Sequence, residues 1–160
     1  MVIDSEEGTE LEPPSSSVPD EGACTALLER VMAACHVAPE AHVAVIGHHT
    51  LPFVLALLRR GCTRVRSLRP GAPAPDCEPV ELAWIVDLGD RRELIDALRA
   101  ARSRIGDHGR IVVEGTACRW RDALASLPNT ALAAGLDVIA ADRRARRLVL
   151  GPSTRLAMAA

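Results

Sequence analysis

Two adjacent histidines, His48 and His49, follow Gly47, and an aspartate, Asp87, ends a later apolar run. An imidazole beside a carboxylate can act as a general base or as a metal ligand. Adjacent residues seldom chelate one ion, so we expect no metal site. We predict His49 and Asp87 as catalytic residues. The alternatives are two histidines that face water at a helix start, and an aspartate that only forms a turn before Gly89.

Arginines form two further candidate binding sites. Arg69 follows a short β pattern, where it could contact a ligand phosphate or be a plain surface residue. A second group near the C-terminus could bind the phosphates of a nucleic acid and consists of Arg143, Arg144, Arg146 and Arg147. The chain has one phenylalanine and two tryptophans to stack on bases. A solvated turn is therefore the alternative for this group.

The composition excludes several chemistries. The 160 residues include 19 basic residues, all of them arginine, and no lysine or tyrosine. A Schiff-base lysine, a Walker-type phosphate lysine and a tyrosine acid are therefore impossible. The five cysteines are well spread and form no C-x-x-C pair, so we expect neither a disulfide framework nor a zinc site. We expect the cysteines to be small core residues of a protein in the reducing cytoplasm. No apolar run in the sequence is long enough to cross a membrane.

The N-terminal segment has a different charge from the rest of the chain. Residues 1–21 contain seven acids and no base, whereas residues 22–160 contain 14 acids and 19 arginines. The segment has little apolar surface to bury, so we expect it to be disordered and to precede one domain over residues 22–160. We also expect it to compete with polyanions for the arginine group near the C-terminus.

Helical and β patterns alternate along the domain. Apolar spacing predicts helices over 23–36, 53–60, 90–105 and around Leu124, and strands over 42–46, 65–68, 82–86, 110–114, 136–141 and 147–150. The helix over 53–60 is apolar nearly all round and should be buried. Pro128 should end the helix before it. Prolines between residues 69 and 80 predict a loop.

This alternation predicts an α/β fold. We expect a three-layer, Rossmann-like, mostly parallel sheet with an antiparallel C-terminal hairpin. Ligands of such sheets bind at the carboxyl ends of the strands. The residues that would then line this crevice are Gly47, His48, His49, Arg69, Asp87 and Glu114.

The order of elements resembles the class I S-adenosylmethionine-dependent methyltransferases. The resemblance covers roughly residues 23–152 and rests on three stretches: VAVIGHHTLPFVLALLRRGCTRVRSLRPG, ELAWIVDLGDRRELIDALRAARSRIGDHGRIVVEG and GLDVIAADRRARRLVLGP. It implies a cofactor seat at Gly47, His48 and Arg69. It also implies that the proline loop replaces one strand and helix of the family, which would shorten the sheet at that edge.

Two binding features depart from the family. Family members carry G-x-G-x-G after the first strand, and here only Gly47 matches, with His48 and His49 in the loop. The family's second strand ends in an acid that accepts bonds from the ribose, and here Arg69 is a donor. These departures predict no cofactor and a non-catalytic binding or regulatory module with a protein partner. The alternative is an active small methyltransferase with an atypical glycine loop.

Overall fold

The computed structural model describes residues 21–73, 78–115 and 123–153. Residues 1–20, for which we predicted disorder, lie outside these ranges. Cys77, Cys118 and Trp120 also lie outside them. The helices are α1 (Glu21–Cys35), α2 (Leu51–Arg59), α3 (Arg91–Arg102) and α4 (Ala123–Ala133). The strands are β1 (His42–Ile46), β2 (Arg64–Leu68), β3 (Val80–Ile85), β4 (Ile105–Glu114), β5 (Leu136–Asp142) and β6 (Arg147–Pro152).

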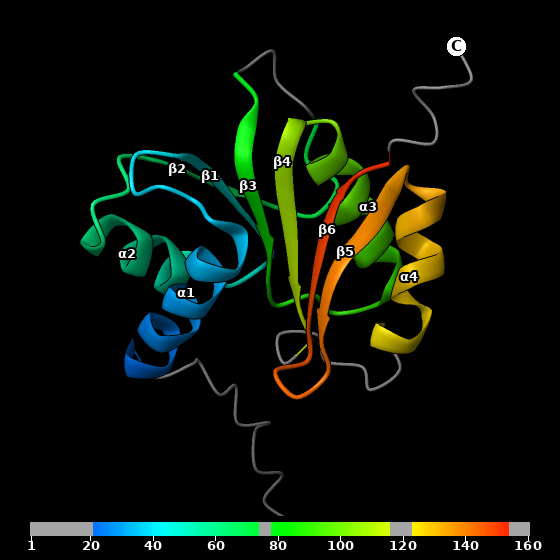
Figure 1. The fold of residues 1–160 in the computed structure, drawn as a ribbon, viewed down its shortest axis with the longest axis horizontal. Coiled ribbons are helices and arrows are strands. Elements are labelled where there is room, and N and C mark those ends of the chain that lie inside the picture. The colour runs from blue at the N-terminus through cyan, green and yellow to red at the C-terminus, as the bar shows by residue number, and fades with distance from the viewer. Residues whose placement is uncertain (1–20, 74–77, 116–122, 154–160) are drawn as a thin grey trace, which may run out of the picture.

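The strands form one mixed sheet in the order β2-β1-β3-β4-β6-β5 (Figure 1). β1 pairs in parallel with β2 and β3, and β3 pairs in parallel with β4. β6 is antiparallel to both β4 and β5. The prediction of a mostly parallel sheet with an antiparallel C-terminal hairpin is confirmed. β2 is the outermost strand at one edge of this sheet.

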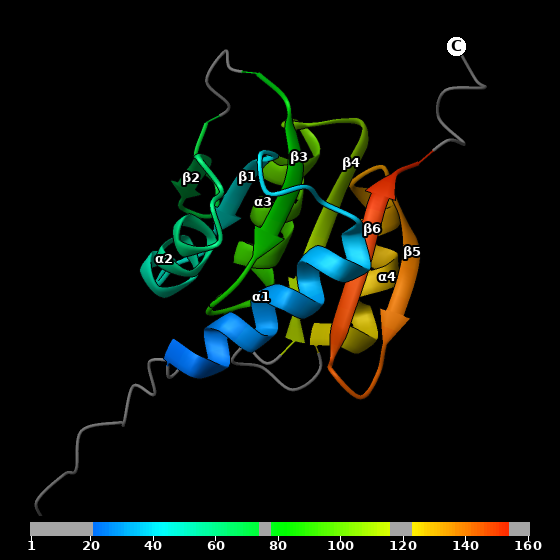
Figure 2. The same ribbon diagram turned by 60° about the vertical axis from the view of Figure 1, so that its left-hand side comes forward.

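Helices cover both faces of the sheet, as the turned view shows (Figure 2). On one face α1 and α2 pack on Val43, Val45 and Trp84, and Phe53 of α2 meets the Trp84 ring edge to face at 5.0 Å. On the other face, α3 and α4 bury Leu94, Leu98, Leu127 and Ala131 against the remaining strand residues. Alternate residues of β1, β3 and β4 therefore serve opposite cores, which explains why these strands are almost continuously apolar.

The helix α2 is only half buried, so the prediction of a fully buried helix is wrong. Phe53, Ala56 and Leu57 face the core, whereas Leu51, Leu55 and Leu58 are 65%, 41% and 48% exposed. The exposed leucines recur at helical spacing and form a stripe on the side away from α1 and the sheet.

The helix α4 continues through Pro128, which the sequence predicted as its end. Leu127 and Ala131 on either side of the proline are fully buried. Their packing holds the helical path although the proline removes one backbone donor.

The connection after β2 is short and is anchored by a buried arginine. The guanidinium of Arg104, at the end of α3, donates hydrogen bonds to the carbonyl oxygens of Ala72 at 3.1 Å and Pro73 at 2.5 Å. A third bond reaches the carbonyl of Ala100 at 2.7 Å. The chain after β2 therefore passes the C-terminal end of α3. In the described ranges, no strand pairs with the outer side of β2.

None of the helices in the described ranges is long and apolar enough to cross a membrane.

Candidate functional site

Gly47 brings the turn after β1 directly against the end of β3. A Cβ atom on Gly47 would lie 1.9 Å from the carbonyl oxygen of Val86. The amide of Gly47 donates to the carbonyl of Leu68 in β2 at 3.0 Å. The first residue after β1 is therefore restricted to glycine by close backbone approach.

His49 and Asp87, the predicted catalytic pair, lie together. The backbone amide of His49 donates to Asp87 Oδ2 at 3.1 Å, and His49 Nδ1 contacts the same oxygen. Asp87 adopts a left-handed backbone conformation with φ of 46°. Because a carboxylate only accepts, Nδ1 carries the proton in this contact, and in the neutral imidazole Nε2 then has the lone pair. The His49 side chain is 59% exposed. This arrangement has the chemistry of an oriented general base.

His48 forms a second pair with Glu93, an acid in the first turn of α3. His48 Nε2 lies 2.8 Å from Glu93 Oε1. The other oxygen of Glu93 accepts from the amide of Gly89 at 2.6 Å. These two bonds, the one from Gly89 above all, hold the pKa of Glu93 below its ordinary value. Asp90 caps α3, because its Oδ1 accepts from the amide of Glu93 at 2.9 Å.

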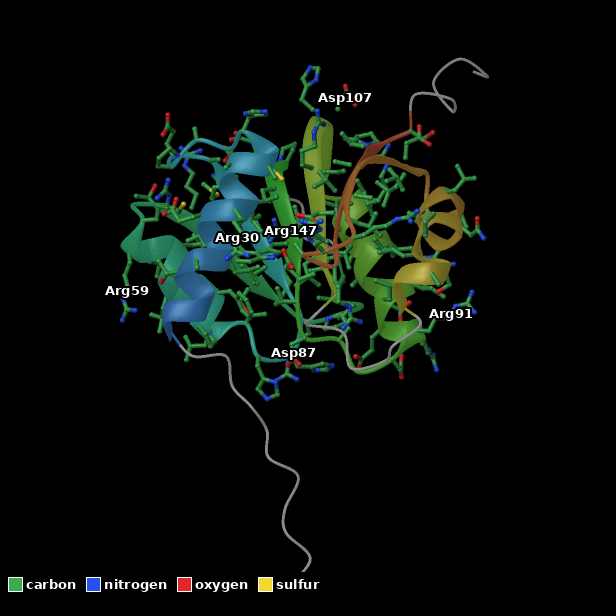
Figure 3. All side chains as sticks on the ribbon, turned by 60° about the horizontal axis from the view of Figure 1, so that its bottom comes forward. Arg30, Arg59, Asp87, Arg91, Asp107 and Arg147 are labelled. Carbon is green, nitrogen blue, oxygen red and sulfur yellow. The ribbon has the colours of Figure 1, made fainter. Side chains whose placement is uncertain are left out.

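Both pairs cross the crevice between β1 and β3. In the order β2-β1-β3 the chain reverses its direction across the sheet between these two strands. This reversal is the place where open α/β sheets bind ligands. Figure 3 shows Asp87 at this end of the strands. No group of metal-ligating residues occurs among the described residues.

Arg69 and Thr50 line the β2 side of the crevice. Arg69 follows β2, is exposed, and forms no ion pair with a carboxylate of the described residues. Thr50 precedes α2, but its hydroxyl does not cap the helix and instead bonds to Ser67 Oγ at 2.5 Å. The threonine therefore ties the turn after β1 to β2.

Glu114 does not line the crevice, and Arg147 is not a surface arginine. These two residues face each other in the β4 and β6 register, and Arg147 Nε donates to Glu114 Oε1. Both side chains are buried beneath α1, where Figure 3 shows Arg30 close to Arg147. Burial raises the pKa of Glu114, against the lowering effect of Arg147. The predictions for Glu114 and Arg147 are therefore wrong, and the pair is structural.

The described cysteines offer no nucleophile. Cys62 is buried and Cys35 is half-buried. Burial raises the pKa of Cys35 to about 11 and also raises the pKa of Cys62. Thiolates are the reactive form, so burial disfavours reaction at both cysteines. The burial of Cys62 fits the prediction of a small core residue.

The comparisons with known proteins identify the fold. The sequence matches no protein-family model and no curated protein. The solved structures similar to it include the CcbJ methyltransferase from Streptomyces caelestis, with 14% identity, TM-score 0.59, and coverage of 86% of this chain and 94% of that one. The chain has a class I methyltransferase-like fold.

Two further structures share this fold. The ribosomal protein L11 methylase from Lactobacillus delbrueckii subsp. bulgaricus is 15% identical, with TM-score 0.60 over 83% of this chain and 78% of that one. CalS10, an amino pentose methyltransferase from Micromonospora echinaspora, is 12% identical, with TM-score 0.51 over 83% of this chain and 91% of that one.

The CalS10 structure corrects one prediction from the sequence. It contains bound S-adenosylmethionine on this fold, which contradicts the prediction of no cofactor. The similar structures named above are methyltransferases, and none of them supports the non-catalytic module.

Proposed function

We propose that the protein is a small S-adenosylmethionine-dependent methyltransferase with an atypical cofactor loop. The observation that carries the proposal is the oriented pair of His49 and Asp87 at the chain reversal of a methyltransferase-like fold. A base close to the attacking hydroxyl or amine assists methyl transfer by taking up its proton.

The residues at the crevice fit the cofactor by their hydrogen-bonding chemistry. Gly47 retains the close backbone approach between β1 and β3. His48 and Arg69 would hold the cofactor, since an imidazole N–H and a guanidinium both bind a carboxylate. Glu93 supplies an acceptor for amino or hydroxyl groups. The crevice thus presents both donors and acceptors to a zwitterionic ligand.

The side chain of His48 can make room for the cofactor at a small cost in free energy. The side chains of His48 and His49 are 37% and 59% exposed, so each can rotate towards solvent. An exposed ion pair contributes about 0–1 kcal/mol. Micromolar binding corresponds to about 8 kcal/mol. Displacing His48 from Glu93 therefore uses only a small part of the binding free energy, which supports cofactor binding despite the missing glycines, while His49 keeps its bond to Asp87.

When bound, S-adenosylmethionine supplies an electrophilic methyl group. His49 would accept the proton of the attacking group at Nε2, while Asp87 fixes the imidazole through Nδ1. Asp87 acts on the reaction through His49 in this account, so it is a positioning residue. His49 and Asp87 lie in the loops that follow β1 and β3, and the pairing of these two strands fixes the positions of the loops.

Calorimetric titration of the full-length protein with S-adenosylmethionine and S-adenosylhomocysteine tests the proposal. We expect dissociation constants in the micromolar range. His48→Ala and Arg69→Glu should weaken binding about tenfold or more, a loss of about 1.4 kcal/mol. Asp87→Asn should leave the affinity for the cofactor nearly unchanged, because Asp87 orients the base His49 and does not hold the cofactor.

His108→Ala is the matched control, since His108 lies exposed in β4, far along the strand from its carboxyl end. Absence of binding tighter than about 1 mM would reject the proposal. Micromolar binding that none of the crevice substitutions changes would show that the site is elsewhere.

A further inference from the structure

The hairpin between β5 and β6 carries three outward-facing arginines. We call Arg143, Arg144 and Arg146 the arginine turn, and all three side chains are exposed. Asp142 fixes its backbone by accepting from the amides of Arg144 at 3.0 Å and Ala145 at 2.9 Å. Because these amide bonds stabilise the charged carboxylate, the bond from Ala145 above all, the pKa of Asp142 is lowered.

The arginine turn lies at the same end of the sheet as the crevice. β4 and β5 are both antiparallel to β6, so β5 ends where β4 ends. No ion pair joins Arg143, Arg144 or Arg146 to a carboxylate of the described residues. The three guanidiniums therefore project a positive potential over the carboxyl ends of the strands.

The start of α1 lies at this end of the sheet as well. Figures 1 and 2 both place the start of α1 and the turn between β5 and β6 on the same side of the molecule. Residues 1–20 are thus attached on the side that carries the arginine turn. They include no base, and their six acids are Asp4, Glu6, Glu7, Glu10, Glu12 and Asp20.

We propose that residues 1–20 bind to the arginine turn of their own chain. Twenty residues can reach at most about 70 Å, which is ample for neighbouring points of one domain. A tethered partner of this length has an effective concentration in the millimolar range, so even weak charge pairing is populated. Bound there, the acidic segment covers a surface that otherwise attracts polyanions to the edge of the crevice.

The other charges at this edge do not replace the arginine turn. Asp87 and Glu93 are bonded to histidines, and Asp90 caps α3. The remaining exposed bases at strand ends or helix starts are Arg69, Arg91 and Arg92. These add to the positive potential and would extend the docking surface rather than oppose it.

Aromatic side chains favour the acidic segment over a nucleic acid as the occupant. Sequence-independent binding of single strands relies on bases stacking on exposed aromatic rings. Phe53 and Trp84, the aromatic residues in the described ranges, are buried in the core. The arginine turn therefore offers charge without stacking, which suits a flexible run of carboxylates.

Arginine-specific labelling of the full-length protein with phenylglyoxal, read by mass spectrometry, tests this proposal. The wild type is compared with a variant that carries Asp4→Asn, Glu6→Gln, Glu7→Gln, Glu10→Gln, Glu12→Gln and Asp20→Asn. We expect the arginine turn to react about twofold or more faster in the variant at low salt. The difference should vanish near 1 M salt, where the Debye length is about 3 Å.

Arg64 and Arg66 in β2 are the internal controls, because they are exposed and lie at the opposite edge of the sheet. Equal labelling of the turn in wild type and variant overturns the proposal. An equal increase at Arg64 and Arg66 also overturns it, since that reports a general field and not docking. Tighter binding of a 20-nucleotide single strand by the variant with unchanged labelling would show a nucleic-acid surface instead.

Discussion

Single residues at the crevice combine backbone restriction with side-chain chemistry. Gly47 has no room for a Cβ atom, and the two residues after it reach across to acids that follow β3. Sequence reasoning could select His49 and Asp87 because both follow apolar strand patterns. It could not select Glu93 as the partner of His48, because that contact depends on how the turn after β1 lies over the start of α3.

Replacing Gly47 tests the close approach at the residue scale. Gly47→Ala should reduce the free energy of unfolding by about 1–3 kcal/mol, since the new methyl group would overlap the carbonyl of Val86. Gly106→Ala is the control, because its Cβ would meet only Pro79 at 3.7 Å. Urea unfolding measures both, and equal stability of the two variants would contradict the crowded turn.

The buried pair of Glu114 and Arg147 gives a second prediction. Glu114→Ala or Arg147→Ala should each cost about 3–5 kcal/mol, because each breaks a buried ion pair. The double variant Glu114→Leu with Arg147→Met should recover most of this loss. If the double variant loses the sum of the two single losses, the charges are not coupled. Thermal and urea unfolding of the three variants decide between these outcomes.

At the scale of elements, sequence periodicity located all the helices and strands described but not which faces they bury. The apolar pattern of α2 predicted burial, yet α1 and the sheet cover only one side of it. The proline in α4 predicted a break, yet core packing on both sides holds the helix. The arginines at the C-terminal hairpin looked alike in sequence, and only the register with β4 turns Arg147 inward.

Adjacent leucines of α2 test its half-burial. Leu57→Ala should lower the free energy of unfolding by about 2–5 kcal/mol, because Leu57 is fully buried. Leu58→Ala should change it by less than about 0.5 kcal/mol, because Leu58 is 48% exposed. Denaturant midpoints at constant slope measure the difference. A large loss from Leu58→Ala would mean that the leucine stripe is covered in solution.

The whole molecule is a shortened version of a widespread architecture. The proline-rich connection after β2 was predictable, because no regular structure fits its sequence, and the structure confirms β2 as the edge strand. Arg64 and Arg66 on this strand discourage pairing with another sheet edge. The sequence also showed the loss of glycines after β1, but it did not show that each histidine there contacts an acid that follows β3.

The central claim is that the crevice between β1 and β3 binds S-adenosylmethionine. A crystal structure of the full-length protein grown with excess S-adenosylhomocysteine tests it most directly. We predict density for the ligand across the carboxyl ends of β1 and β3, in contact with Gly47 and with His48 turned away from Glu93. An empty crevice in which His48 still contacts Glu93 at millimolar ligand, or ligand bound elsewhere, would contradict this prediction.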